Sequence, residues 1–267
     1  GPEFPISILP RAGKVLLEQL RARGWLDVRD VPLAELRNDN HRRVAEATAK
    51  GVPDIAPELF STLAEIPYPR HYLDFETISF VVPRWVGTRP FQQVPFQFSC
   101  HVESAPGEFT HQDFLDLSGQ SPLSSFVEAL LKSAGATGAV VVWNQAFEAT
   151  RIRELAEMFP QHANALNNII DRMVDLLPIY REHYYHPAML GSWSIKAVLP
   201  TIAPDLDYSN LEVGDGGAAQ EAYLRAISSS VSDVERETLR QALLTYCERD
   251  TWAMVRLANW NGAAHGT

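Results

Sequence analysis

The chain has 267 residues, of which 46% are hydrophobic and 21% are charged, so it can bury a sizeable core. Its formal net charge of −10 argues against a protein that coats duplex DNA through a broad basic surface. No apolar run approaches the roughly 20 residues that a membrane-spanning helix needs. The two separated cysteines, Cys100 and Cys247, indicate neither a disulfide framework nor a cysteine-based zinc site, and they favour a reducing, cytoplasmic setting.

The first part of the chain is predicted to be helical. Residues 1–4 (Gly-Pro-Glu-Phe) are typical of a remnant of tag cleavage and cloning. Residues 5–66 are predicted to form a helical N-terminal segment or connector. Its helices are expected in KVLLEQLRARG, in LAELRNDNHRRVAEATAKG and in APELFSTLAEI, the first two ending at Gly24 and Gly51.

Residues 67–260 are predicted to form the main domain, followed by a tail over 261–267. Strands are expected in RHYLDFETI, VPFQFSCHVE and FTHQDFLDL, with a hairpin turn at Pro106 and Gly107. A helix (SPLSSFVEALLKSAG), a buried strand (GAVVVWN) and a helix ended by Pro160 follow, and a long helix closes the domain over 232–259. This order predicts an α/β fold, a ribonuclease-H-like mixed sheet flanked by helices.

Acidic residues interrupt the apolar pattern of two elements. Asp74 and Glu76 lie on one face of the first strand, about 7 Å apart along it, and repel each other unless a cation lies between them. Asp250 lies on the apolar stripe of the last helix, four residues after Tyr246. A carboxylate there is costly unless it pairs with a buried Arg or Lys or binds a cation.

A third acidic position follows the buried strand of the domain. Asn144 is a candidate N-cap, and Glu148 falls in the first turn of the helix behind it, where acidic residues are common because of the helix dipole. Four carboxylates that converge on one face would suit two divalent cations about 4 Å apart. Oxygen ligands of this kind select Mg²⁺ or Mn²⁺.

In these motifs the chain resembles the DEDD superfamily of 3′–5′ exonucleases, from about residue 70 to 258. The resemblance implies metal-ligand roles for Asp74, Glu76 and Asp250. Tyr246 matches the Tyr-type branch, in which this residue orients the attacking water. The second motif ends in Glu148 where the family has Asp, so either Glu148 reaches the second metal or Asp175 replaces it.

The stretch from LDFET through RPFQQVPFQFS, YYHP and GSWSIK also resembles a bacterial domain family of unknown function. Members of this family often follow a RecB-like nuclease domain. The resemblance implies an upstream RecB-like nuclease as a partner in a longer protein, with residues 5–65 as the connector.

Several residues are candidates for contact with a nucleic-acid substrate. Arg84, Trp85 and Phe91 combine cationic and aromatic side chains that suit phosphate binding and base stacking, unless their loop folds over a small core of its own. Asn144 lies at the strand end beside Glu148. Lys196, in GSWSIK, is a candidate phosphate ligand or a solvated surface lysine.

These patterns predict a two-metal-ion 3′–5′ exonuclease, with Asp74, Glu76, Glu148, Asp250 and Tyr246 as its catalytic residues. Its expected substrate is single-stranded DNA or RNA. Two alternatives stay open: a catalytically weak or inactive nucleic-acid-binding module of a larger nuclease, and a ribonuclease-H-like endonuclease.

Overall fold

The computed structural model describes residues 1–206, 208–209 and 211–263, and the chain divides into two compact units. The first unit comprises Gly1–Ala64, Leu177–Leu206 and Trp260–Thr267, and the second comprises Glu65–Leu176 and Asp207–Asn259. The predicted start of the main domain is residue 67, and one break of this division lies between Ala64 and Glu65. Residues 177–206, which were predicted to belong to the main domain, group here with the first unit, where Tyr184 and Tyr185 pair with Ile55 and Asp54 in a small antiparallel sheet.

The first unit is built from short helices. They are α1 (Lys14–Ala22), α2 (Asp39–Lys50), α3 (Glu58–Ala64), α7 (Leu176–His183) and α8 (Ile195–Ile202), with the two-residue strands β1 (Asp54–Ile55) and β7 (Tyr184–Tyr185). Helix α2 begins later than predicted because the Asn38 side chain accepts hydrogen bonds from the amides of Asn40 and His41 and caps it there. Gly51 ends it in the left-handed region, with φ of 66°.

The second unit contains a five-stranded mixed sheet in the order β4-β3-β2-β5-β6. Its strands are β2 (Arg70–Ile78), β3 (Val94–Ala105), β4 (Glu108–Leu115), β5 (Ala139–Val142) and β6 (Met173–Asp175). Strands β2, β3 and β4 pair antiparallel, whereas β2, β5 and β6 pair parallel. The predicted α/β class with a mixed sheet is confirmed, and β6 is a strand that the sequence pattern did not predict.

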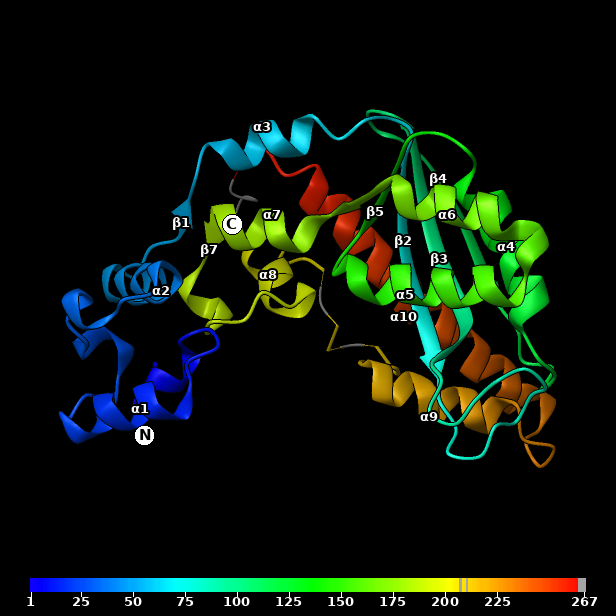
Figure 1. The fold of residues 1–267 in the computed structure, drawn as a ribbon, viewed down its shortest axis with the longest axis horizontal. Helices are drawn as coiled ribbons and strands as arrows, with labels where there is room; N and C mark the ends of the chain where they lie inside the picture. Colours follow the sequence, from blue (N-terminus) through cyan, green and yellow to red (C-terminus); the bar gives the residue numbers. More distant parts are fainter. Residues whose placement is uncertain (207, 210, 264–267) are drawn as a thin grey trace. The chain divides into compact units, whose positions relative to one another are not determined.

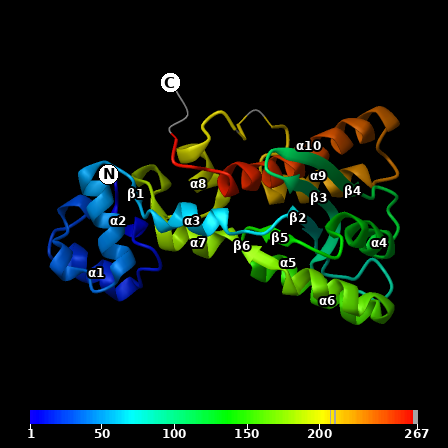
Figure 2. The same ribbon diagram turned by 90° about the horizontal axis from the view of Figure 1, so that it is seen from above.

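Helices cover both faces of this sheet. They are α4 (Leu123–Ala134), α5 (Gln145–Met158), α6 (Ala163–Asp171), α9 (Gly216–Ala226) and α10 (Asp233–Ala258). Helix α10 starts where the sequence predicts, with Ser232 accepting a hydrogen bond from the Glu235 amide. Figure 2 shows the sheet between α10 on one side and α5 and α6 on the other. Across the described residues, no helix is both long enough and apolar enough to cross a membrane.

The alternation of side chains along the strands separates an apolar face from a polar one. Phe75 and Phe98 pack edge-on against Phe126 of α4, with ring centroids 5.1 and 5.4 Å apart. On the opposite face, Ser99 of β3 hydrogen-bonds Thr251 of α10 at 2.7 Å. Helix α10 therefore crosses the polar face of the sheet (Figure 1), the face to which the alternation also directs the acidic residues of β2.

Candidate metal centre

Three of the predicted carboxylates come together at the polar face of the sheet. Asp74 and Glu76 project from β2, and Asp250 projects from α10. One carboxylate oxygen from each lies within 4.8 Å of the others. The register explains the meeting: Asp74 lies opposite Ser99 on β3, and Ser99 hydrogen-bonds Thr251, the neighbour of Asp250.

Mutual repulsion and burial make this cluster costly when all its members are charged. Burial raises the pKa of Asp74 well above its usual range, and the negative charges of Asp250, Glu76 and Glu148 raise it further. The Cys247 thiol lies 3.9 Å from Asp74 Oδ2 and opposes this shift in the pKa. A cation among these oxygens would reverse the effect, because it favours the charged form of every member.

Glu148 extends the cluster from the first turn of α5. Its side chain is buried, with 3% of its surface exposed, and its Oε2 atom has no hydrogen-bond partner among the described residues. Burial is the main cause that raises the pKa of Glu148 to about 8, and the nearby Asp175 and Glu76 add to it. A buried carboxylate oxygen without a protein partner can serve as a cation ligand, so the residues fit a metal site.

The side chain of Asp175, and not that of the predicted N-cap residue Asn144, accepts the hydrogen bonds at the start of α5. Asn144 adopts a left-handed conformation, with φ of 72°, and its side chain makes no capping hydrogen bond. The two carboxylate oxygens of Asp175 instead accept hydrogen bonds of 2.9 Å from the backbone amides of Asn144 and Gln145. The prediction of Asn144 as the capping side chain was therefore wrong, and Asp175 positions the turn from which Glu148 projects.

Two tyrosines accompany the carboxylates. Tyr246 is buried one turn before Asp250, and its pKa is raised by burial and by the charges of Asp250, Glu76 and Asp74. Tyr208 was missed by the sequence analysis: its hydroxyl donates a hydrogen bond of 2.6 Å to Asp250 Oδ1. It lies in a connecting segment 42 residues before Asp250, so no periodic pattern links the two residues.

The predicted substrate-contacting residues have different surroundings. Trp85 is a core residue, 8% exposed, that packs against Phe80 and donates a hydrogen bond to the carbonyl oxygen of Gly119, so its predicted role in base stacking was wrong. Phe91 is 69% exposed. Arg84 is exposed as well. Lys196 lies in the first turn of α8, in the other unit of the chain.

Comparison with known proteins adds a family resemblance without an activity. Residues 71–194 match a family model described as a domain of unknown function, DUF2779. This agrees with the expected resemblance to a bacterial domain family of unknown function. The matched range contains Asp74, Glu76 and Glu148, whereas Tyr246 and Asp250 lie beyond it. No solved structure matches the chain.

Three curated relatives carry the name of uncharacterized proteins. The chain is 25% identical over 213 residues to uncharacterized protein UU173 of Ureaplasma parvum, which covers 72% of this chain. It is 28% identical over 205 residues to the MG366 homolog of Mycoplasma pneumoniae and 26% identical over 207 residues to MG366 of Mycoplasma genitalium, each covering 70% of this chain. In each case the match spans 31% of the relative's length, so the chain spans about a third of the curated relatives that it matches.

Proposed function

We propose that the second unit is a metal-dependent nuclease that removes nucleotides from the 3′ end of single-stranded DNA or RNA. The observation that carries the proposal is the meeting of Asp74, Glu76 and Asp250 within 4.8 Å, with buried Glu148 electrostatically coupled to them. The order of these residues along the chain is the one on which the resemblance to DEDD exonucleases rests.

The four carboxylates would hold two divalent cations, with Mg²⁺ or Mn²⁺ as the species that oxygen ligands prefer. When bound, such ions act as Lewis acids toward the phosphoryl oxygens and lower the pKa of the attacking water. Asp74 and Glu76 share one strand face and Asp250 belongs to a rigid helix, so the protein presents its ligands on regular elements.

The tyrosines position the reacting groups and take no proton. The raised pKa of Tyr246 keeps its phenol protonated at neutral pH, so its hydroxyl can hydrogen-bond a water molecule but cannot act as a general base. Tyr208 fixes the side chain of Asp250 through the hydrogen bond to Oδ1. These two hydroxyls account for the orientation of the water and of one metal ligand.

A single strand is the substrate that the surface favours. The formal net charge of −10 disfavours broad contact with a duplex. Exposed Phe91, with Arg84 in the same loop, can stack on an unpaired base and hold a phosphate, which a fully paired base does not permit.

A second candidate function is a nucleic-acid-binding module with a weakened metal site. The observation that favours it is the deep burial of Glu148, since a carboxyl group with a pKa of about 8 is largely protonated at neutral pH and binds a cation only after losing its proton. Activity measurements separate the two candidates.

The test is to incubate the protein with a 5′-labelled single strand, as DNA and as RNA, in Mn²⁺ or in EDTA. We expect products that shorten from the 3′ end only in Mn²⁺, and none with Asp74→Asn. Asp113→Asn, at an exposed position of β4 in the same sheet, is the matched control and should retain activity.

The other outcomes are equally informative. Cleavage of a circular single strand would identify an endonuclease. If Asp74→Asn keeps wild-type turnover, the catalytic assignment is wrong. If neither the DNA strand nor the RNA strand is cleaved but the protein still binds the strand, the nucleic-acid-binding module is favoured.

A further inference from the structure

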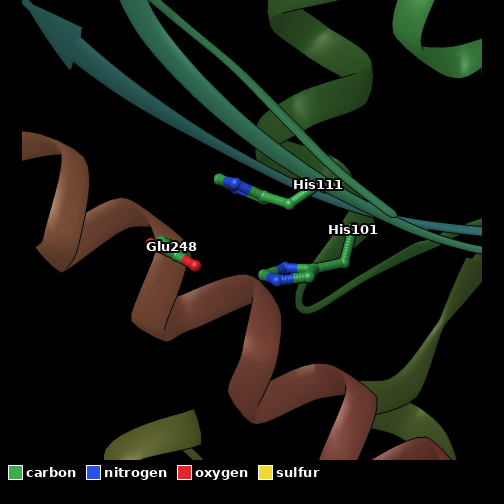
Figure 3. Close-up of side chains that lie close together, drawn as sticks. All are labelled: His101, His111 and Glu248. Carbon is green, nitrogen blue, oxygen red and sulfur yellow. The ribbon is translucent and has the colours of Figure 1, made fainter. Parts of the chain in front are cut away.

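A second group of metal-ligating side chains lies on the polar face of the same sheet. His101 of β3 and His111 of β4 are directly opposite each other in the antiparallel register, and their ring centroids are 4.4 Å apart. Glu248 of α10 projects toward the two rings (Figure 3). One ligand atom from each of the three residues lies within 4.8 Å of the others.

Hydrogen bonds orient both imidazoles through one nitrogen each. His101 Nδ1 lies 2.8 Å from Thr251 Oγ1, and His111 Nε2 lies 2.8 Å from Ser99 Oγ. The two hydroxyls are 2.7 Å apart, and that of Thr251 donates to the backbone oxygen of Glu248. One consistent assignment has both ring N–H groups donating to these hydroxyls and Ser99 donating to Thr251. Each ring then keeps a lone pair on its second nitrogen.

This pattern is the one that metal-binding histidines use. A histidine ligand commonly donates its other N–H to an oxygen, which fixes both the tautomer and the direction of the ring. An apolar wall adjoins the group, because the Trp252 ring packs against His101 and Phe109 packs against Trp252. Apolar side chains lower the local dielectric constant, so the attraction between a cation and its ligands is stronger beside this wall.

The chemistry of the ligands selects the cation. Two imidazole nitrogens and one carboxylate suit Zn²⁺ or a neighbouring transition metal, with water as a fourth ligand, whereas Mg²⁺ prefers oxygen alone. Zinc ligands in tetrahedral geometry lie about 3.3 Å apart, a spacing that follows from bond lengths of about 2.05 Å. Glu248 is exposed, so its side chain can rotate the short distance that closes the triangle.

We propose that His101, His111 and Glu248 form a transition-metal site, of the Zn²⁺ class, separate from the carboxylate cluster of Asp74, Glu76 and Asp250. The site would join the β3–β4 hairpin to α10. Because Thr251 adjoins Asp250, and Ser99 is the register partner of Asp74, a cation here would fix the elements that carry the other cluster. The inference concerns binding alone and does not depend on nuclease activity.

The test is calorimetric titration of metal-free, tag-free protein with ZnCl₂ in the presence of millimolar Mg²⁺, which occupies oxygen-only sites. We expect one class of Zn²⁺ site in the wild type. Glu248→Gln and His111→Ala should each weaken Zn²⁺ binding at least about tenfold, a loss no smaller than that seen when an outer-shell partner is removed. Co²⁺ should give the visible absorption of a nitrogen-ligated ion in the wild type, and this absorption should be lost in His111→Ala.

Two controls separate this site from other sources of zinc binding. Glu237→Gln changes another exposed carboxylate of α10, which pairs on the surface with Arg240 and Gln241, and this variant should bind Zn²⁺ as the wild type does. Asp74→Asn should also retain the Zn²⁺ site. The proposal is overturned if natively folded wild type, checked by circular dichroism, binds no Zn²⁺. It is equally overturned if Glu248→Gln and His111→Ala bind as tightly as wild type, or if only Asp74→Asn loses binding.

Discussion

At the scale of single residues, Glu148 is a deeply buried member of the cluster whose charged form is costly in the absence of a cation. Its carboxyl group is almost completely buried, its Oε2 atom has no hydrogen-bond partner among the described residues, and the charges of Asp175 and Glu76 raise its pKa further. In the absence of a cation the protein avoids this cost by protonating the group. Stability without metal should therefore depend on pH in a defined direction.

The folded protein raises the pKa of Glu148 from its ordinary value of 4.5 to about 8. A group whose pKa is raised by folding contributes stability that is fully present below the unfolded value and is lost as pH rises through the folded value. In EDTA we expect the melting temperature of wild type to fall between pH 5 and pH 8.5. Through this residue, the free energy of unfolding should fall by at most about 1.4 kcal/mol per pH unit.

Glu148→Gln removes the titrating group, so the decrease of the melting temperature with rising pH should become smaller. The remaining decrease is the contribution of Asp74. Thermal unfolding at several pH values measures the effect. The exposed Glu157 of the same helix supplies the control, since Glu157→Gln should keep the wild-type slope. An unchanged slope in Glu148→Gln would contradict the assigned cause.

Tyr246 tests the proposed chemistry at the same scale. If its hydroxyl orients the attacking water, Tyr246→Phe should lower kcat about 100-fold, the order of loss that follows a misplaced reactant, with little change in KM. Its melting temperature should stay close to that of wild type. Tyr223→Phe removes a buried hydroxyl that has no hydrogen-bond partner among the described residues and should leave kcat unchanged. Equal effects of the two substitutions would indicate a role in packing.

At the scale of elements, short-range sequence patterns predicted which side chains share one face of a strand or helix. They did not predict contacts between segments that are far apart in the sequence. The two-residue period placed Asp74 and Glu76 on one strand face, and the i, i+4 spacing placed Tyr246 and Asp250 on one side of α10. The hydrogen bonds from the amides of Asn144 and Gln145 to Asp175 join residues about 30 positions apart, and no local sequence periodicity predicts them.

The histidine pair depends on a feature that the predicted turn does not specify. The turn at Pro106 and Gly107 pairs Ala105 with Glu108, and continuing that register would place His101 opposite Gln112. An irregularity between Glu103 and Ala105 shifts the register by one residue, so that His101 lies opposite His111. The two-residue strands β1 and β7 are likewise too short for any periodicity to reveal.

Arg172 joins three elements of the second unit and permits a test of stability. Its guanidinium donates hydrogen bonds of 2.6 to 3.1 Å to the carbonyl oxygens of Ala134, Gly135, Thr137 and Gly138, at the end of α4 and the entry to β5. Arg172→Ala removes these hydrogen bonds, at a cost of about 2 kcal/mol for a bond to a charged group. Denaturant unfolding should show this loss.

Arg153→Ala, at an exposed position of α5, is the matched control for Arg172 and should change the free energy of unfolding by less than about 0.5 kcal/mol. Arg172→Lys keeps the charge but cannot reach all four acceptors from one flat group, so it should recover only part of the loss. Full recovery by Lys would mean that charge alone, and not the fork of donors, stabilises this junction.

At the scale of the whole molecule, both candidate sites lie in the second unit, on the face of the sheet that α10 crosses. The clustered carboxylates of Asp74, Glu76, Glu148 and Asp250 repel one another, so the binding of cations and the stability of the unit are linked. A ligand that binds only the folded state stabilises it by RT ln(1 + [L]/Kd), about 2.7 kcal/mol when the ligand is at 100 times its Kd.

We therefore expect Mg²⁺ to raise the melting temperature of metal-free protein by several degrees, since about 1 kcal/mol corresponds to about 2–4 °C for chains of 150–250 residues. The rise should increase with pH between 6 and 8, because Asp74 and Glu148 must lose protons before they bind a cation. Asp74→Asn combined with Asp250→Asn should abolish the rise, whereas Glu248→Gln should retain it because its site selects nitrogen-preferring ions. A rise that survives the double substitution would place the stabilising Mg²⁺ elsewhere on the chain and remove the main support for the two-metal mechanism.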